Sequence, residues 1–322
     1  MNRNEVLNSI SLKKRFCKDM NLPITLFDNP YFSQRLMILS PMFGCVESFD
    51  QFVKELGRFK NEEEYFAYYN DVKEKMICQI RGNQIYNIFS LAKLDKEPQS
   101  PFVARNLYVE TNDNKTFISI DMNCANFSVL HMWDSSIFND HDNWYDFVAD
   151  YTDLEHIRRS KYIRQVVLGA CSPGKQIYYE GWYMKLLAQH IVSILPAVNI
   201  YSVNVDEILI EMDNDSSERY TIKELKETVH DSFLGPYVKI KEFDLHKLQG
   251  IDGYILNVYD DVEDYVVFKC INGEIFHQVL LHYYGFPIKE DDLVFYHNGK
   301  LARFLEPIPN PWEDQKRNKN ES

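Results

Sequence analysis

The stretch FISIDMNCANFSVL, residues 117–130, decides the fold class because it joins a strand pattern to a helix pattern. Its first half is a run of apolar and β-branched residues, which predicts a buried strand that delivers Asp121 at its end. An acid in this place has two readings. Asp121 is a candidate metal ligand or catalytic group. The alternative is that it forms a turn or a helix N-cap after the strand, which is common for aspartate.

Outward from this stretch, the periodicity predicts an α+β protein with four regions. Residues 1–112 place apolar side chains at helical spacing, as at Phe49, Phe52, Val53 and Leu56, and predict a mainly helical region. Residues 113–247 alternate strand, helix, helix, strand, helix and strand patterns. Residues 248–310 are expected to be rich in β-hairpins, with Asn-Gly turns at 272–273 and 298–299. Residues 311–322 form a polar, flexible tail. A further hairpin turn is predicted at 112–114.

The composition limits the classes of function. A net charge of −13 argues against a protein that coats duplex nucleic acid over its whole surface. The six cysteines are dispersed without a CxxC pair, which favours free thiols over disulfides or a zinc site. With a charged N-terminus and no apolar run near eighteen residues, we expect a soluble, cytoplasmic protein that has no contact with a membrane.

Charge is distributed unevenly along the chain. Residues 156–190 contain a single acid, Glu180, and six basic residues: Arg158, Arg159, Lys161, Arg164, Lys175 and Lys185. This basic strip indicates either a surface that binds an anionic ligand or an ordinary solvated helix face.

The same segment contains a glycine motif with two interpretations. Residues 169–175 match the pattern G-x-x-x-x-G-K of a P-loop, which makes a P-loop nucleotide hydrolase one candidate. However, Gln176 stands where the motif requires Ser or Thr for magnesium. The hairpins expected near the C-terminus also do not supply the strand–helix repetition of such a sheet.

Three segments, in their order and spacing, resemble the motifs of reverse transcriptases. FISIDMNCANFSVL resembles the first catalytic motif, and VVLGACSP, residues 166–173, resembles the glycine loop before a long helix. IYSVNVDEILIEMDNDSSERYTIKELKETV, residues 200–229, resembles the Y-x-D-D hairpin with its following helix. The resemblance implies a ferredoxin-like palm domain over 113–247 and a fingers-like role for 1–112. Family A DNA polymerases are a second, more distant relative.

This resemblance implies a nucleic acid polymerase, a nucleotidyltransferase that joins nucleoside triphosphates to a primer 3′-hydroxyl. Asp121 and Asp206 would hold two Mg²⁺ or Mn²⁺ ions, together with the backbone carbonyl of Met122. Glu207 takes the place of the second hairpin acid, as a ligand or as a support for the ligands. The implied partners are a nucleic acid primer and template, nucleoside triphosphates, and other proteins.

The resemblance also suggests residues that contact nucleotide or template: Asn126, Lys161, Arg164, Gly169, Ser172 and Lys175. Asn126 replaces an aromatic residue that excludes the ribose 2′-hydroxyl, so we expect relaxed sugar discrimination; the alternative is an ordinary helix-start asparagine. Gly169 and Ser172 would let the backbone approach the template. Lys239 and Lys241 have two readings, as a proton donor near the site or as charges on a strand edge.

The hairpin lacks the usual tyrosine and second aspartate, and the expected C-terminal region is β-rich where the family has a helical thumb. A second function class is therefore a non-catalytic nucleic-acid-binding or replication-accessory protein on the same scaffold. The P-loop hydrolase is the third. Close approach of Asp121 and Asp206 in space is the condition on which the polymerase interpretation depends.

Overall fold

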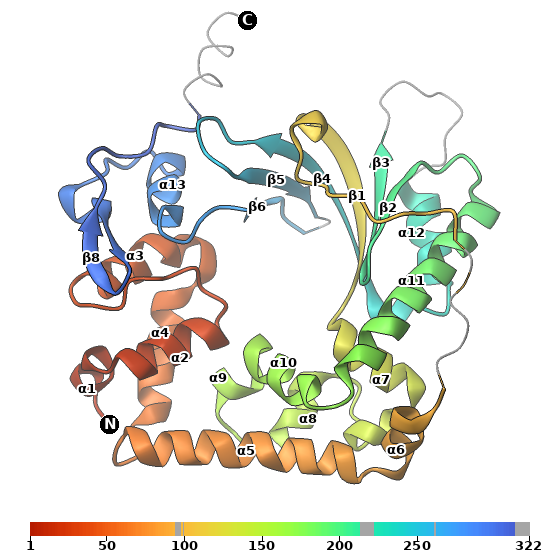
Figure 1. Cartoon of the computed structure of the whole chain (residues 1–322), viewed down its shortest axis with the longest axis horizontal. Helices are drawn as coiled ribbons and strands as arrows, with labels where there is room; N and C mark the ends of the chain where they lie inside the picture. Colours follow the sequence, from red (N-terminus) through yellow and green to blue (C-terminus); the bar gives the residue numbers. More distant parts are fainter. Residues whose placement is uncertain (94–97, 99, 213–221, 261, 313–322) are drawn as a thin grey trace, which may run out of the picture.

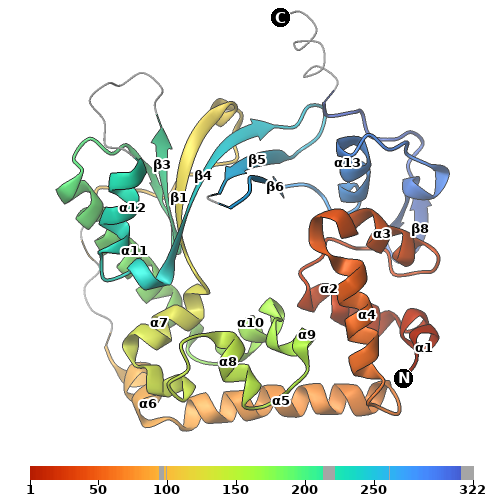
Figure 2. The same ribbon diagram turned by 180° about the vertical axis from the view of Figure 1, so that it is seen from behind.

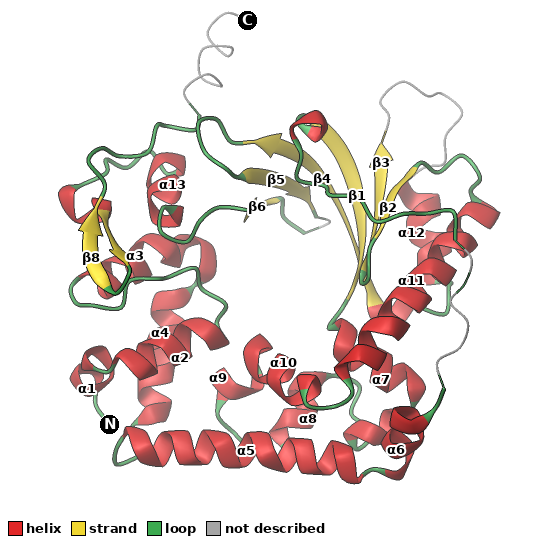
Figure 3. Ribbon diagram, in the orientation of Figure 1, coloured by secondary structure: helices red, strands yellow, loops and turns green. Residues whose placement is uncertain are grey.

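The computed structural model describes residues 1–93, 98, 100–212, 222–260 and 262–312, which form a mixed α+β protein. A sheet and its covering helices occupy one side of the molecule (Figure 1). The long helix α5 (Glu62–Gly82) runs along the base, and the N-terminal helices stand beside the C-terminal elements on the opposite side. Figure 3 shows how helices and strands segregate in this arrangement.

The N-terminal region is helical, as predicted. Asn61 caps α5 by accepting a hydrogen bond from the Glu64 N–H at 2.9 Å, and three acids in the first turn favour the helix dipole. In α4, Phe49, Phe52 and Leu56 of the predicted stripe are buried. The helices before and after α5 are α1 (Arg3–Asn8), α2 (Ile10–Asp19), α3 (Tyr31–Phe43), α4 (Cys45–Leu56) and α6 (Gln84–Leu91).

The middle of the chain builds most of an antiparallel sheet. In the described chain the sheet has six strands in the order β2-β3-β1-β4-β5-β6. Its first four are β1 (Lys115–Met122), β2 (Ile200–Val203), β3 (Glu207–Met212) and β4 (Val238–Lys247). Between β1 and β2 lie α7 (Ala125–Trp133), α8 (Trp144–Ala149), α9 (Glu155–Arg158), α10 (Lys161–Gly169) and α11 (Pro173–Ile194), and α12 (Ile222–His230) precedes β4.

The two faces of this sheet have different neighbours. Ile118 and Ile120 of β1 are fully buried in the main core, on the face that α11 and α12 cover (Figures 1 and 2). Because side chains alternate along a strand, Ser119 and Asp121 point to the other face. The antiparallel register pairs Asp121 with Glu207 on β3 and with Lys239 on β4, so these side chains share that face.

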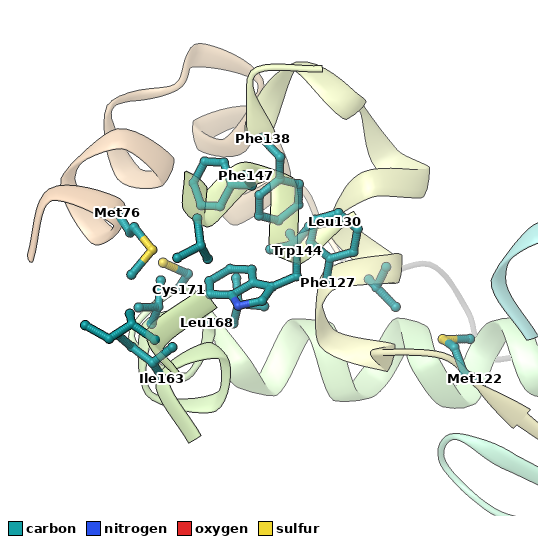
Figure 4. Close-up of a cluster of buried hydrophobic side chains, with 14 of the residues drawn as sticks. Met76, Met122, Phe127, Leu130, Phe138, Trp144, Phe147, Ile163, Leu168 and Cys171 are labelled. Carbon is teal, nitrogen blue, oxygen red and sulfur yellow. The ribbon is translucent and has the colours of Figure 1, made fainter. Parts of the chain in front are cut away.

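A compact apolar cluster joins α7 and α10 to the base of the molecule (Figure 4). Phe127 and Phe138 lie with ring centroids 4.4 Å apart, and Trp144 packs against both Phe127 and Phe147. Ile163 of α10 belongs to the same core and is fully buried. The cluster fixes the two helices that carry the polar residues described below.

The C-terminal region differs from the prediction in one hairpin and matches it in another. Strands β7 (Val294–His297) and β8 (Lys300–Arg303) form a hairpin through Asn298 and Gly299, both with positive φ, as their sequence predicts. The prediction at Asn272-Gly273 was wrong. Strand β6 (Tyr265–Lys269) is followed by α13 (Phe276–Tyr283), and Gly273 packs closely against the chain at Pro23 and Thr25.

The hairpin predicted at 112–114 was also wrong. Residues Glu110–Asn112 form a 3-10 turn, and β1 pairs with β3 and β4 rather than with the residues before it. Strand β5 (Tyr254–Tyr259) pairs with β4, so the sheet continues across the expected boundary at 247. Most of the predicted tail, residues 313–322, lies outside the described residues. Within the part of the chain that is described, every helix is too short or too polar to cross a membrane.

Elements from the first and last parts of the described chain, α3 and α13, lie side by side (Figure 2). Helix α13 packs on α3, and Phe43 lies 6.1 Å from Phe276 between ring centroids. Arg35 of α3 forms a buried ion pair with Asp292 at 3.1 Å. The molecule is therefore closed by contacts of α3 with α13 and with the turn that contains Asp292.

Candidate functional site

A polar cleft of ≈ 590 Å³ lies where β1 ends. Its walls come from the end of β1, the β2–β3 turn, the start of β4, and helices α7, α10 and α11. The residues that line it and carry charge are three acids and four bases: Asp121, Glu180, Asp206, Lys161, Arg164, Lys239 and Lys241. The cleft therefore gathers the charged groups of segments that are far apart in the sequence.

Asp121 and Asp206 meet in this cleft although 85 positions separate them. The Met122 N–H donates a hydrogen bond to the Asp206 carbonyl at 2.8 Å, which fixes the β2–β3 turn against the end of β1. Both acids line the same cleft, and the Asp206 carboxylate acts electrostatically on Asp121. Met122 itself is buried, and it also lines the cleft.

The carboxyl group of Asp121 is in an unfavourable environment for a negative charge. Burial raises its pKa, and the nearby Asp206 carboxylate raises it further. Lys241, Lys161 and Lys269 act in the opposite direction and lower it, but the net shift is upward. A cation bound between the two aspartates relieves both the burial and the repulsion.

Glu207 faces the same side of the sheet but is held away from the cleft. The Ser119 hydroxyl donates a hydrogen bond to its carboxylate at 2.7 Å, and Glu207 is not among the residues that line the cleft. Burial raises the pKa of Glu207, Ser119 opposes this, and Asp121 and Asp206 raise it further. Of the two roles expected for Glu207, this position fits support better than direct ligation.

Glu180 is a site residue that the sequence interpretation missed. It lies on α11, is 7% exposed, and lines the cleft. Burial raises the pKa of Glu180 to about 7, and the Asp206 carboxylate adds to the shift. The signal available in the sequence was its position as the one acid within the basic strip at 156–190.

Four basic residues line the cleft together with its acids. Lys161 and Arg164 come from one face of α10, as their spacing of three predicts for a helix. Arg164 donates to the Cys124 sulfur at 2.6 Å, and its buried Nε atom has no hydrogen-bond partner. Lys239 and Lys241 lie on β4 and pair with β1, but the pairing of β4 with β5 begins only at Glu242. The β5 side of the strand is therefore open at the two lysines, which fits their interpretation as strand-edge charges as well as a location beside the acids.

Asn126 and Gly169 also line the cleft, in agreement with their predicted location. Asn126 is the second residue of α7, and its side-chain oxygen accepts a hydrogen bond from the Phe127 N–H at 3.0 Å. Part of its hydrogen-bonding capacity is therefore used at the start of the helix, as the alternative interpretation expected. Its location in the cleft is compatible with both interpretations.

Ser172 and Lys175, which we expected to contact nucleotide or template, point elsewhere. The Ser172 hydroxyl lies 3.0 Å from the hydroxyl of Tyr86. The Lys175 ammonium donates to the carbonyls of Phe89, Ser90 and Ala92, at 2.8 and 2.9 Å for the first two. Lys175 is thus a cap for the C-terminus of α6, because the last carbonyls of a helix lack intrahelical donors.

A second observation, besides the position of Lys175, contradicts the P-loop interpretation. The residues before the glycine motif, Lys161–Gly169, form helix α10 and not the strand that a P-loop follows. The small residues of this segment instead allow a sharp turn between two helices. Ser172 has a positive φ of 53°, and Pro173 takes the first position of α11, where proline is favoured.

The acids of the cleft do not form a complete set of protein ligands around one metal position. Among the residues that the structure describes, no three His, Cys, Asp or Glu side chains are grouped closely enough to hold a metal ion by themselves. Mg²⁺ is commonly held by one or two carboxylates with water and substrate oxygens as the remaining ligands. Asp121 and Asp206 fit that requirement.

Comparison of the chain with known protein families, curated proteins and solved structures gave no match. No function can therefore be transferred from a relative.

Proposed function

We propose that the protein is a nucleotidyltransferase of the polymerase type, with a ferredoxin-like palm between residues 113 and 247. The order of elements supports this proposal. Strand β1, its helices, the β2–β3 hairpin, α12 and β4 follow a β-α-β-β-α-β sequence, and β2-β3-β1-β4 is the order of their antiparallel sheet. In this arrangement the end of β1 and the β2–β3 turn are neighbours, which is where a palm needs its acids.

The observation that carries the proposal is the meeting of Asp121 and Asp206 in a cleft with four basic residues. A like-charged pair of acids costs free energy in the folded protein, and the pKa of Asp121 is raised by burial and by Asp206, which is a feature of many functional sites. Asp121, Asp206 and the carbonyl of Met122 would hold a divalent cation. Such cations, when bound, neutralise charge on a transferring phosphoryl group and on the oxygens at either side of it.

The remaining cleft residues orient an anionic substrate. Lys161 and Arg164 approach from α10, and Lys239 and Lys241 from the sheet, so phosphate groups between them are contacted from two sides. Arg164 is suited to a phosphate contact, because its planar guanidinium offers several donors, one of which contacts the sulfur of Cys124. The overall charge of −13 leaves this cleft as the local site for a polyanion.

Primer extension with Mg²⁺ or Mn²⁺ tests the proposal. We expect the full-length protein to extend a primer–template, and we expect Asp121→Asn and Asp206→Asn each to lower the rate by about 100-fold or more, because each removes charge from the reacting centre. Glu242→Gln is the matched control. This acid alternates with Lys239 and Lys241 on β4 and so faces away from the cleft. Extension that survives both aspartate substitutions contradicts the proposal.

Sugar preference is tested at Asn126. If its small side chain admits the 2′-hydroxyl, Asn126→Tyr will reduce use of ribonucleotides more than use of deoxyribonucleotides. The ratio of the two kcat/KM values is the measurement. An unchanged ratio assigns Asn126 to the helix start alone.

Non-catalytic binding of nucleic acid is the second candidate function. The specific observation in its favour is that Glu207, at the position of the family's second hairpin acid, is bonded to Ser119 and is absent from the lining of the cleft. In that case Lys161→Gln and Lys241→Gln will weaken binding and flatten its dependence on salt, because fewer counterions are released. Binding without extension, unchanged by Asp121→Asn, favours this candidate.

A further inference from the structure

Glu180 is an acid for which the proposed palm has no assigned role. Its side chain lines the cleft, yet the residue is 93% buried, since only 7% of its surface is exposed. Within the described residues it has no hydrogen-bond donor and no ion-pair partner. Its carboxylate opens onto the cleft, and the surrounding protein supplies no polar contact that replaces the hydration lost by burial of the rest of the side chain.

The packing of α11 places Glu180 next to the β2–β3 turn. Pro173, Ile177 and Glu180 recur at helical spacing on the face of α11 that lines the cleft. The following residue, Gly181, lies against the turn, where a Cβ atom added to it would be 4.0 Å from the Cα of Val205. The absence of a side chain at Gly181 therefore lets α11 approach the turn, and this brings Glu180 close to Asp206.

The charges around Glu180 do not compensate for its burial. Asp206 is the charged group that acts on it, and its effect is unfavourable. The contrast with Asp121 is clear, since Lys241 and Lys161 both act to stabilise the Asp121 carboxylate. A positive charge beside Glu180 would compensate for its burial. Carboxylate oxygens such as those of Glu180 and Asp206 favour a hard divalent cation.

We propose that Glu180 and Asp206 hold a second divalent cation, beside the one held by Asp121 and Asp206. This inference rests on the proposed function and adds to it a third acid that comes from a helix rather than from the strand ends. Asp206 lies between the two positions and contributes to both. Glu207 is not required for this, because its carboxylate is bonded to Ser119.

Counting bound Mn²⁺ tests the proposal without any reaction. Full-length protein is titrated with Mn²⁺ in the absence of nucleotide, and free Mn²⁺ is measured by electron paramagnetic resonance. We expect two ions per chain for the native sequence. Glu180→Gln will lose one ion, or bind it at least about tenfold more weakly, and will keep the other.

Three further variants sharpen the result. Asp121→Asn will also lose one ion, Asp206→Asn will lose both, and Glu207→Gln will keep two. Glu242→Gln, on the opposite face of the sheet, is the control for removal of any half-buried acid. Circular dichroism of each variant establishes that it is folded, and Glu180→Ala provides a second substitution if Glu180→Gln does not fold.

The outcomes separate this inference from the function on which it rests. Two ions in folded Glu180→Gln, or one ion in the native protein, overturns the role of Glu180 even if primer extension depends on Asp121 and Asp206. Two ions that depend on Glu180, in a protein that extends no primer, support the cation pair and reject the polymerase.

Discussion

The protein buries charged side chains in two places, and these are paired with an opposite charge in one place but not in the other. At the junction of α3 and α13, Arg35 is 4% exposed and Asp292 is 6% exposed, and they neutralise one another. In the cleft, Asp121, Glu180 and Asp206 are acids that lie near one another, and within the described residues their carboxylates have neither a hydrogen-bond donor nor an ion-pair partner. The first arrangement joins segments that are distant in the sequence, and the second is the one that we propose binds a cation.

The junction satisfies nearly every polar atom of its charged groups. Besides the ion pair, Arg35 donates to the carbonyls of Asp291 at 3.2 Å and Val294 at 3.3 Å. His277 lies 2.6 Å from the carbonyl of Asp292 through its Nε2 atom, which as a neutral imidazole donates the proton. A completed network of this kind fixes one geometry, whereas the cleft leaves its charges open to a ligand.

Breaking the junction has the largest expected effect on stability. Arg35→Met leaves the buried Asp292 carboxylate without its counter-charge and should lower the free energy of unfolding by about 3–5 kcal/mol. Urea denaturation followed by circular dichroism measures this loss. The matched control is Arg3→Met, which removes an ion pair with Asp50 that is exposed to solvent and should cost less than about 1 kcal/mol. Equal losses in the two variants contradict the assignment of Arg35.

Acid should weaken the junction through His277. Burial lowers the pKa of His277 to about 3, and the adjacent Arg35 acts in the same direction. Between that pH and the ordinary value of 6.5, the unfolded chain binds a proton that the folded protein excludes. The contribution is fully present above about pH 6.5 and is lost as the pH falls, by about 2 kcal/mol near pH 5. Unfolding curves for the native protein and His277→Gln should converge as the pH is lowered.

Glu180 should show the opposite dependence on pH. The pKa of Glu180 is raised from 4.5 to about 7, so between these values the folded protein binds a proton that the unfolded chain does not. Its stabilising contribution is present below about pH 4.5 and is lost as the pH rises to about 7. Without divalent cations, Glu180→Gln should therefore be more stable than the native protein by about 1–2 kcal/mol near pH 8 and equal to it near pH 4. A constant difference across this range argues against a raised pKa.

Substitution of Lys175 gives the smallest expected effect. It tests whether this lysine has a structural role or belongs to the cleft. Since its ammonium caps the last carbonyls of α6, Lys175→Met should lower stability by about 1 kcal/mol. The rate of primer extension should remain unchanged, whereas Lys161→Met, from within the cleft, should reduce it. Loss of extension in Lys175→Met at full stability would return Lys175 to the site.

The sequence predicted the elements whose patterns are local. The helical stripe of α4, the strand before Asp121 and the turn at Asn298-Gly299 all follow from the spacing or chemistry of adjacent residues. The hairpin at Asn272-Gly273 failed because the glycine serves a contact with Pro23 and Thr25, about 250 positions away, which no local pattern reveals.

For the candidate site, the sequence predicted the acids at the strand ends better than the charged residues on the helices. Asp121 and Asp206 were found from the order of motifs, but the ammonium of Lys175 reaches α6, and only the fold shows where that helix ends. Glu180 was visible as a lone acid among bases, and its meaning depends on burial and on the approach of α11 to the β2–β3 turn. Contacts between distant segments thus decide which charges of the basic strip belong to the cleft.

The closure of the molecule between α3 and α13 has a consequence for how it is made. Arg35 and Asp292 are separated by 257 positions, so the ribosome must synthesise all of the chain between them before the two can meet. Until then, the Arg35 guanidinium lacks its carboxylate partner. Helix α3 therefore completes its packing only after residue 292 has been made, and a nascent chain that stops short of this residue is left with an open seam.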